Sequence, residues 1–118
     1  MPRESRSRVT VLLPAPDTLH EFLLLDAVIT ELIEIAGGVT VSSIVPSVFD
    51  GWWRDTAATT VADANVLIVA DVGVATDDPS LLLYLDALKV RCQEDFQQDI
   101  VWVTVHQVDR ITTGDFLK

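Results

Sequence analysis

The feature that most constrains the fold is a helical repeat of apolar residues between two β-rich runs, ending at a pair of glycines. Residues 18–36 carry apolar side chains at helical spacing, with acidic side chains on the opposite side. Asp17 is placed as the N-cap, and Gly37-Gly38 supplies a left-handed stop. The predicted buried stripe is Phe22, Leu25, Ile29, Leu32, Ile33 and Ala36.

A second helix is predicted from Pro79 to Phe96. It begins at Thr76-Asp77-Asp78-Pro79, where an acidic N-cap precedes proline at the first helical position. Helix-start chemistry also explains the Asp77-Asp78 pair better than a catalytic role does. The predicted buried stripe is Leu81, Leu82, Leu85, Leu88, Cys92 and Phe96.

Four β-rich runs flank these helices. They are 9–13, 39–45, 65–72 and 100–107, with the 46–62 connection expected to be a protruding hairpin or a long loop. The order is strand, helix, strand, strand, helix, strand. Two interleaved βαβ units of this kind predict an α+β fold, with a four-stranded antiparallel sheet and both helices on one face. The main alternative is a flavodoxin-like parallel sheet, which requires a helix between the second and third strands.

The predicted organisation is one domain over residues 9–108, preceded by a disordered basic arm (1–8) and followed by a polar tail (109–118). A chain of 118 residues is the usual size of a single domain. No apolar stretch follows the basic start as in a signal peptide, and none is long enough to cross a bilayer.

The glycine-rich helix end before Val39-Thr40-Val41 and the turn Gly51-Trp52-Trp53-Arg54-Asp55 resemble small uncharacterised bacterial proteins with the ferredoxin-like (βαββαβ) fold. The run from Lys89 to Val101 resembles their junction between the second helix and the last strand. The resemblance covers about residues 9–108, and it implies this fold without an established activity.

The charge is strongly one-sided. The net charge is −10, and from Val9 onward five Lys and Arg face seventeen Asp and Glu. Such an acidic body repels phosphate backbones and anionic lipids, so we expect neither nucleic acid nor a membrane as partner. The lone cysteine, Cys92, cannot form an intramolecular disulfide, which favours a reducing cytoplasm.

Because both helices cover one face of the predicted sheet, the other face needs a partner, a ligand or solvent. Its expected residues are Thr10, Leu12, Thr40, Ser42, Leu67 or Ile68, Trp102, Thr104 and His106. Trp102 and His106 lie on the same side of one strand, roughly 13 Å apart. His106 is the best candidate for a catalytic acid or base. The competing interpretation packs Trp102 into a dimer interface, with His106 at its polar rim.

The segment containing Trp52, Trp53 and Arg54 is the least expected in the chain. Adjacent side chains on an extended strand point in opposite directions, so at least one tryptophan must leave the local core. An exposed tryptophan beside an arginine is typical of an interface, most simply with another copy of the chain. The alternative is that both tryptophans pack against the helix ends.

No metal or cofactor is predicted. His20, His106, Cys92 and the carboxylates lack ligand spacing, and no nucleophile, Walker or dinucleotide glycine motif is present.

The leading hypothesis is a homo-oligomeric interaction or binding module, most simply a homodimer. It would act through the open sheet face and the 49–54 hairpin. The alternatives are a small dimeric α+β-barrel enzyme, using His106 on a small hydrophobic ligand, and a small-molecule sensing domain. Both alternatives place a pocket on the open face, and all three rest partly on fold analogy.

Overall fold

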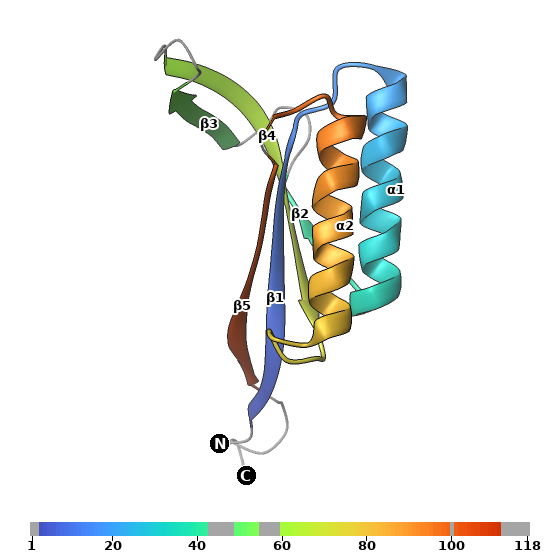
Figure 1. Ribbon diagram of the computed structural model, residues 1–118, viewed down its shortest axis with the longest axis vertical. Helices are drawn as coiled ribbons and strands as arrows, with labels where there is room; N and C mark the ends of the chain where they lie inside the picture. The colour runs from blue at the N-terminus through green and yellow to red at the C-terminus, as the bar shows by residue number, and fades with distance from the viewer. Residues whose placement is uncertain (1–2, 43–48, 55–59, 100, 112–118) are drawn as a thin grey trace.

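A computed structural model describes the backbone of residues 3–42, 49–54, 60–99 and 101–111, and the same side chains except those of 49–54 and 60–64. The elements follow the predicted order, with one additional short strand (Figure 1). They are β1 (Arg3–Pro14), α1 (Leu19–Ala36), β2 (Thr40–Val41), β3 (Phe49–Arg54), β4 (Thr60–Val72), α2 (Pro79–Asp95) and β5 (Trp102–Ile111).

The main sheet has the strand order β2-β4-β1-β5, and each of its pairs is antiparallel. Both helices lie on one face of this sheet (Figure 1). These findings confirm the ferredoxin-like α+β prediction. The flavodoxin-like alternative is wrong, because β2 and β4 pair antiparallel, and the described residues between them form a strand and no helix.

The core lies between the sheet and the two helices. Strand alternation places Val9, Val11 and Leu13 of β1 toward the helices, all at most 1% exposed. Val11 pairs with Ile68 on one side and Val103 on the other, so apolar side chains form a continuous floor. The helices complete this core with Leu25, Val28, Leu32, Leu81, Leu85, Leu88 and Cys92.

The helix ends are capped largely as predicted. Asp78 caps α2, its side chain accepting a hydrogen bond from the Leu81 N–H at 3.0 Å, and Pro79 follows at the first position. Gly37 ends α1 with a φ of 84°, which favours glycine. The N-cap of α1 is Thr18 rather than Asp17, because the Thr18 hydroxyl accepts from the Glu21 N–H.

The buried stripes differ from the prediction at three positions. Phe22, Ile33 and Leu82 are each about two-fifths exposed, and Val28 is buried instead on α1. Each of these exposed side chains has other apolar residues next to it in the chain. Which of them faces the sheet depends on how the helix is rotated against it, and periodicity does not fix that rotation.

The prediction of a disordered arm over residues 1–8 is wrong for residues 3–8. β1 begins at Arg3 and pairs with β5 along most of its length, with Arg3 opposite Ile111. The ladder therefore continues into the segment expected to be a polar tail, as far as Ile111. Ser7 is fully buried and donates its hydroxyl hydrogen bond to the Val74 carbonyl, which attaches this end of the strand to the body.

The second and third predicted strands also have different bounds. β2 comprises only Thr40–Val41, and residues 43–45 of the predicted strand lie outside the described residues, as does Ile100 of the last strand. β4 begins at Thr60, five residues before the predicted start, and its first half pairs antiparallel with β3. Of the two interpretations of residues 46–62, a hairpin or a long loop, the pairing of β3 with β4 supports the hairpin for the described residues 49–54 and 60–62.

The β3–β4 ribbon extends away from the helices and the main sheet (Figure 1). It contributes to an elongated molecule of 57 × 32 × 30 Å with a radius of gyration of 16.2 Å. A compact chain of this length has a radius of gyration of about 13.5 Å. A projecting two-stranded ribbon gains little burial within its own chain.

Candidate functional site

The face of the sheet opposite the helices carries an apolar row at the level of Trp102. Trp102 pairs with Leu12, and Leu12 pairs with Leu67 on the next strand. Ser42 lies beside Leu67, donating its backbone N–H to the Leu67 carbonyl and accepting from the Leu67 N–H. Trp102 is 60% exposed. A large aromatic surface on an uncovered face is typical of an interaction site.

The next rows become progressively more polar. Val69, Thr10 and Thr104 lie side by side across β4, β1 and β5, and Thr40 of β2 pairs with Val69 at the edge. Two residues further along, Asp71, Arg8 and His106 form the third row. The structure thus places Trp102, Thr104 and His106 on the face where the sequence analysis expected them, and of the two residues offered there it is Leu67, not the buried Ile68, that lies on it.

The third row is organised by an ion pair between Arg8 and Asp71. The Arg8 guanidinium donates from Nε and Nη2 to the two carboxylate oxygens, at 2.8 and 3.0 Å. This bidentate hydrogen bonding lowers the pKa of Asp71 and raises that of Arg8. Asp71 therefore stays ionised and holds Arg8 in a fixed orientation.

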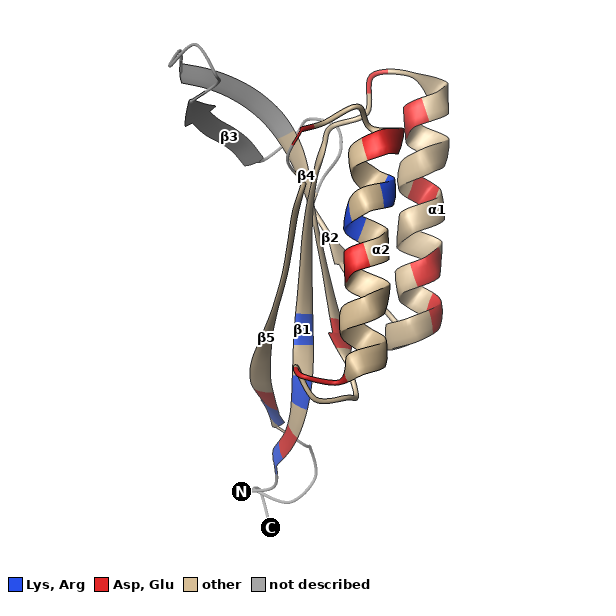
Figure 2. Cartoon of the chain, in the orientation of Figure 1, with Lys and Arg blue, Asp and Glu red and all other residues tan. Residues whose placement is uncertain are grey.

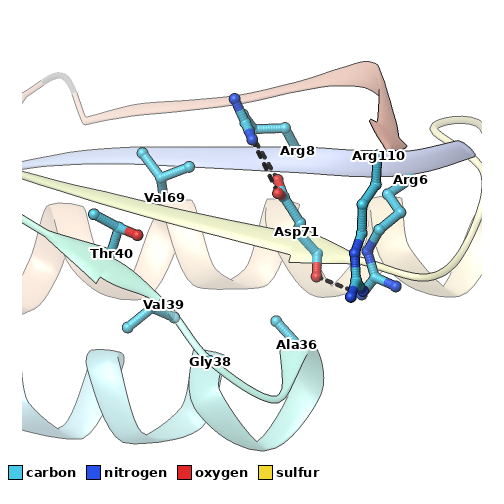
Figure 3. Close-up of a pocket in the computed structure, with 9 residues that line it drawn as sticks. All are labelled: Arg6, Arg8, Ala36, Gly38, Val39, Thr40, Val69, Asp71 and Arg110. Atoms are coloured by element: carbon cyan, nitrogen blue, oxygen red, sulfur yellow. Dashed lines mark hydrogen bonds and ion pairs between the residues drawn. The ribbon is translucent and has the colours of Figure 1, made fainter. Parts of the chain in front are cut away.

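Two more arginines lie at this end of the sheet. Arg6 donates to the backbone carbonyl of Asp71 at 2.9 Å and pairs with one oxygen of Glu4 at 2.5 Å. Arg110 of β5 lies 4.0 Å from the other Glu4 oxygen. Figure 3 shows the Arg6 and Arg110 guanidinium groups together, with Arg8 on the other side of Asp71. The Glu4 carboxylate is thus shared by Arg6 and Arg110.

These arginines line a pocket of about 410 Å³. Its other side is the turn from α1 into β2, including Gly38 and Val39 (Figure 3). The full lining is Arg6, Arg8, Ala36, Gly38, Val39, Thr40, Val69, Asp71 and Arg110.

A second cavity, of about 450 Å³, lies between the start of β1 and the connection from β4 to α2. Ser5, Ser7, Gly73, Thr76 and Asp77 are among its lining residues. Neither cavity is lined by Trp102, Thr104 or His106. The predicted pocket for His106 therefore has no counterpart in these two cavities.

The tryptophan segment forms β3. Trp52, Trp53 and Arg54 pair through their backbones with Ala62, Val61 and Thr60 of β4. Their side chains lie outside the described part of the structure. The role of these three residues in an interface stays a prediction.

The remaining reactive groups are held in structural positions. Cys92 is buried in the core, and burial raises the pKa of its thiol to about 11. Burial also raises the pKa of Tyr84. Arg91 of α2 pairs with Glu31 of α1 at 2.9 Å, which joins the two helices. Among the described residues, no three His, Cys, Asp or Glu side chains gather in a group that could hold a metal ion.

Sequence reasoning missed the arginine pocket because residues 1–8 were expected to be disordered. A signal was present: Arg6, Arg8, Thr10 and Leu12 alternate with Ser7, Val9, Val11 and Leu13 in one unbroken period of two. That pattern extends the strand back through the arginines and assigns Arg6 and Arg8 to the open face. Arg110 has no such local signal, since only the β1–β5 register brings it near.

The fold defines the class: a small α+β protein with a ferredoxin-like sheet, one face of which is covered by helices. No protein-family model matches the chain, and no curated protein matches it. Neither helix, within the residues described, has the length and apolar character needed to span a bilayer.

Solved structures with similar folds do exist. CutA1 from Oryza sativa superposes with a TM-score of 0.54 at 18% identity, covering 97% of this chain and 86% of its own. The divalent cation tolerance protein CutA1 from Thermus thermophilus gives 0.51 at 14% identity, covering 94% and 87%. A phage SAM lyase, solved with S-methyl-5'-thioadenosine, gives 0.51 at 17% identity, covering 90% and 89%. At these identities the likeness is one of fold.

Proposed function

We propose that this protein is a homo-oligomeric binding module, most simply a dimer, that self-associates through its open sheet face and the β3–β4 hairpin. The observation that carries this proposal is Trp102, 60% exposed on the face that no helix covers. Leu12 and Leu67 extend its apolar surface across three strands. Covering this row would remove Trp102 from water, and Trp102 is the largest exposed aromatic side chain among the described residues.

The distribution of charge favours a second copy as the partner. Figure 2 shows the acidic residues located mainly on the helices and at the ends of the sheet. The rows around Trp102 consist of uncharged residues: Ser42, Leu67, Leu12, Thr40, Val69, Thr10 and Thr104. Two chains of net charge −10 can therefore meet at this face with their acidic helices pointing outward.

Two further features support self-association. β5 is an edge strand of ten residues, paired only with β1 in the described sheet. An edge of this length presents backbone hydrogen-bonding groups to another chain. The β3–β4 ribbon projects from the body, and a ribbon of two strands needs packing partners for stability.

The test compares two variants by light scattering coupled to gel filtration at about 10 µM. The wild type is expected to have a mass at least twice the 13.0 kDa of one chain. Trp102→Glu places a charge on the apolar row and is expected to give the monomer. Leu23→Glu is the matched control, since Leu23 is also 60% exposed but lies on α1, and it should leave the mass unchanged.

A monomeric wild type at this concentration would contradict the proposal. So would a Trp102→Glu variant that keeps the wild-type mass.

The reducing cytoplasm remains the proposed compartment, because the single thiol lies in the core. The enzymatic alternative with His106 gains no support from the two cavities, and it stays a prediction.

A further inference from the structure

Positive charge is concentrated at one end of this acidic molecule. Four of the eight Lys and Arg residues, Arg3, Arg6, Arg8 and Arg110, lie where β1 begins and β5 ends. Figure 2 shows this end of the two strands as the main basic region of the described sheet. Three of the four line the 410 Å³ pocket.

Among the described residues, the three arginines of the pocket outnumber the two carboxylates paired with them, Asp71 and Glu4. Asp71 is the one acidic residue in the pocket lining, and both of its oxygens are occupied by Arg8. Glu4 is shared between Arg6 and Arg110. Arg110 has, in the described structure, only this one ion pair at 4.0 Å, and its side chain is 63% exposed. The pocket thus retains an excess of positive charge and guanidinium donors without close acceptors.

We propose that this pocket binds a small organic phosphate ester between Arg6 and Arg110. A guanidinium presents a planar pair of N–H donors that matches two oxygens of such a group. Glu4 bridges these two arginines from one side, and the anion would lie between the same two guanidinium groups. Asp71 serves the site as a positioning residue, because its carboxylate orients Arg8 and its carbonyl orients Arg6.

The opposite wall sets the rest of the ligand. Ala36, Val39 and Val69 are apolar, and Gly38 leaves open space beside its Cα. The ligand therefore combines an anionic end with a short apolar or neutral portion. A volume of about 410 Å³ lies near the lower end of the range for metabolite pockets, so the ligand is a small one.

The experiment is isothermal titration with two probes, inorganic phosphate and phenyl phosphate, and with phenol as the neutral comparison. The wild type is expected to bind both phosphates saturably at one site per chain, with phenyl phosphate tighter. Arg6→Gln and Arg110→Gln are each expected to weaken binding at least tenfold. Arg3→Gln is the matched control, because Arg3 lies at the same end of the sheet outside the pocket lining, and it should change affinity less than threefold.

Three results would overturn the proposal: no saturable binding of either phosphate at 10 mM, an equal loss in Arg3→Gln, or unchanged affinity in both pocket variants. Unfolding curves for each variant show whether a loss of binding reflects a loss of fold. All nine lining residues come from one chain, so Trp102→Glu is expected to retain binding as a monomer. The oligomer and the anion site can therefore fail separately.

Discussion

The two faces of the sheet are built from alternate residues of the same strands, yet they differ in exposure, polarity and charge. On β1, Val11 and Leu13 are fully buried under the helices, whereas Thr10 and Leu12 remain partly exposed on the other side. On β1 the covered face is apolar from Leu13 back to Val9, and the next residue on that face is Ser7. The open face changes along its length, from the uncharged row at Trp102 to the arginines at Arg8 and Arg6.

The difference indicates how the chain divides its tasks. The covered face supplies stability through burial of apolar side chains. The open face offers two separate surfaces, the Trp102 row and the arginine pocket, about 20 Å apart along β1 from Leu12 to Arg6. An apolar surface and a cationic pocket favour different partners, so we propose self-association for the Trp102 row and anion binding for the arginine pocket.

The largest effect is expected from leucine truncations at neighbouring positions of β1. Leu13→Ala removes a side chain with no exposed surface from the core, and it should lower the free energy of unfolding by about 3 kcal/mol. Leu12→Ala changes the open face and should cost about 1 kcal/mol or less. Urea unfolding of both variants in the Trp102→Glu background, where the monomer is expected, gives the comparison without a contribution from assembly.

Equal losses at the two positions would mean that the open face is as well packed as the core. In that case the face would not be free to meet a partner. In the wild-type background, by contrast, Leu12→Ala should also weaken self-association, and Leu13→Ala should do so only through lost stability.

A smaller effect is expected where the covered face ends, at Ser7. Ser7→Ala removes the hydroxyl of a fully buried side chain that donates to the Val74 carbonyl, and it should lower the free energy of unfolding by about 1 kcal/mol. Ser5 lies on the same strand and is exposed, so Ser5→Ala should change the free energy of unfolding by no more than about 0.5 kcal/mol. Denaturant unfolding of the two variants measures whether the start of β1 is an integral part of the sheet, and indistinguishable curves would contradict it.

The sequence predicted the covered face better than the open one, for physical reasons. Burial selects apolar residues, and the period of two in Val9, Val11 and Leu13 is a direct record of it. The same strand continues through Arg6 and Ser7, where polar residue types hide the pattern. Ser7 donates a hydrogen bond to the Val74 carbonyl and Arg8 forms a salt bridge with Asp71, and both partners lie far away in the sequence, so no local signal indicates them.

The candidate site was predictable only in part. One strand carries Trp102, Thr104 and His106 at alternate positions, so their common face followed from the sequence. The arginine pocket draws on β1, β4, β5 and the turn after α1, and only the sheet register brings these segments together. On the helices the difficulty was a different one. Leu81 and Leu82 are adjacent and equally apolar, and only the packing of α2 determines which of the two is buried.

The smallest effect is expected at the ion pair on the open face. The pKa of Asp71 is lowered in the folded protein, so its ionised form contributes stability above the pKa of the unfolded chain, near 4. That contribution is lost as the pH falls through the lower folded-state pKa. Both side chains are about one-third or more exposed, so solvent limits the contribution to about 0.5–1 kcal/mol.

Asp71→Asn should therefore lower the free energy of unfolding by about 0.5–1 kcal/mol at pH 7, with the difference from wild type shrinking as the pH falls below about 4 and through the lowered folded-state pKa. Asp86→Asn on the exposed side of α2, where the described structure shows no ion pair to Asp86, is the control and should change the free energy of unfolding at pH 7 by less than about 0.5 kcal/mol. Urea unfolding at each pH, with and without 1 M NaCl, measures both variants, and salt should reduce the Asp71 difference. A difference that does not shrink as the pH is lowered below about 4 would show that Asp71 stabilises this end of the sheet through packing, and the arginines of the pocket would then be oriented by something other than its charge.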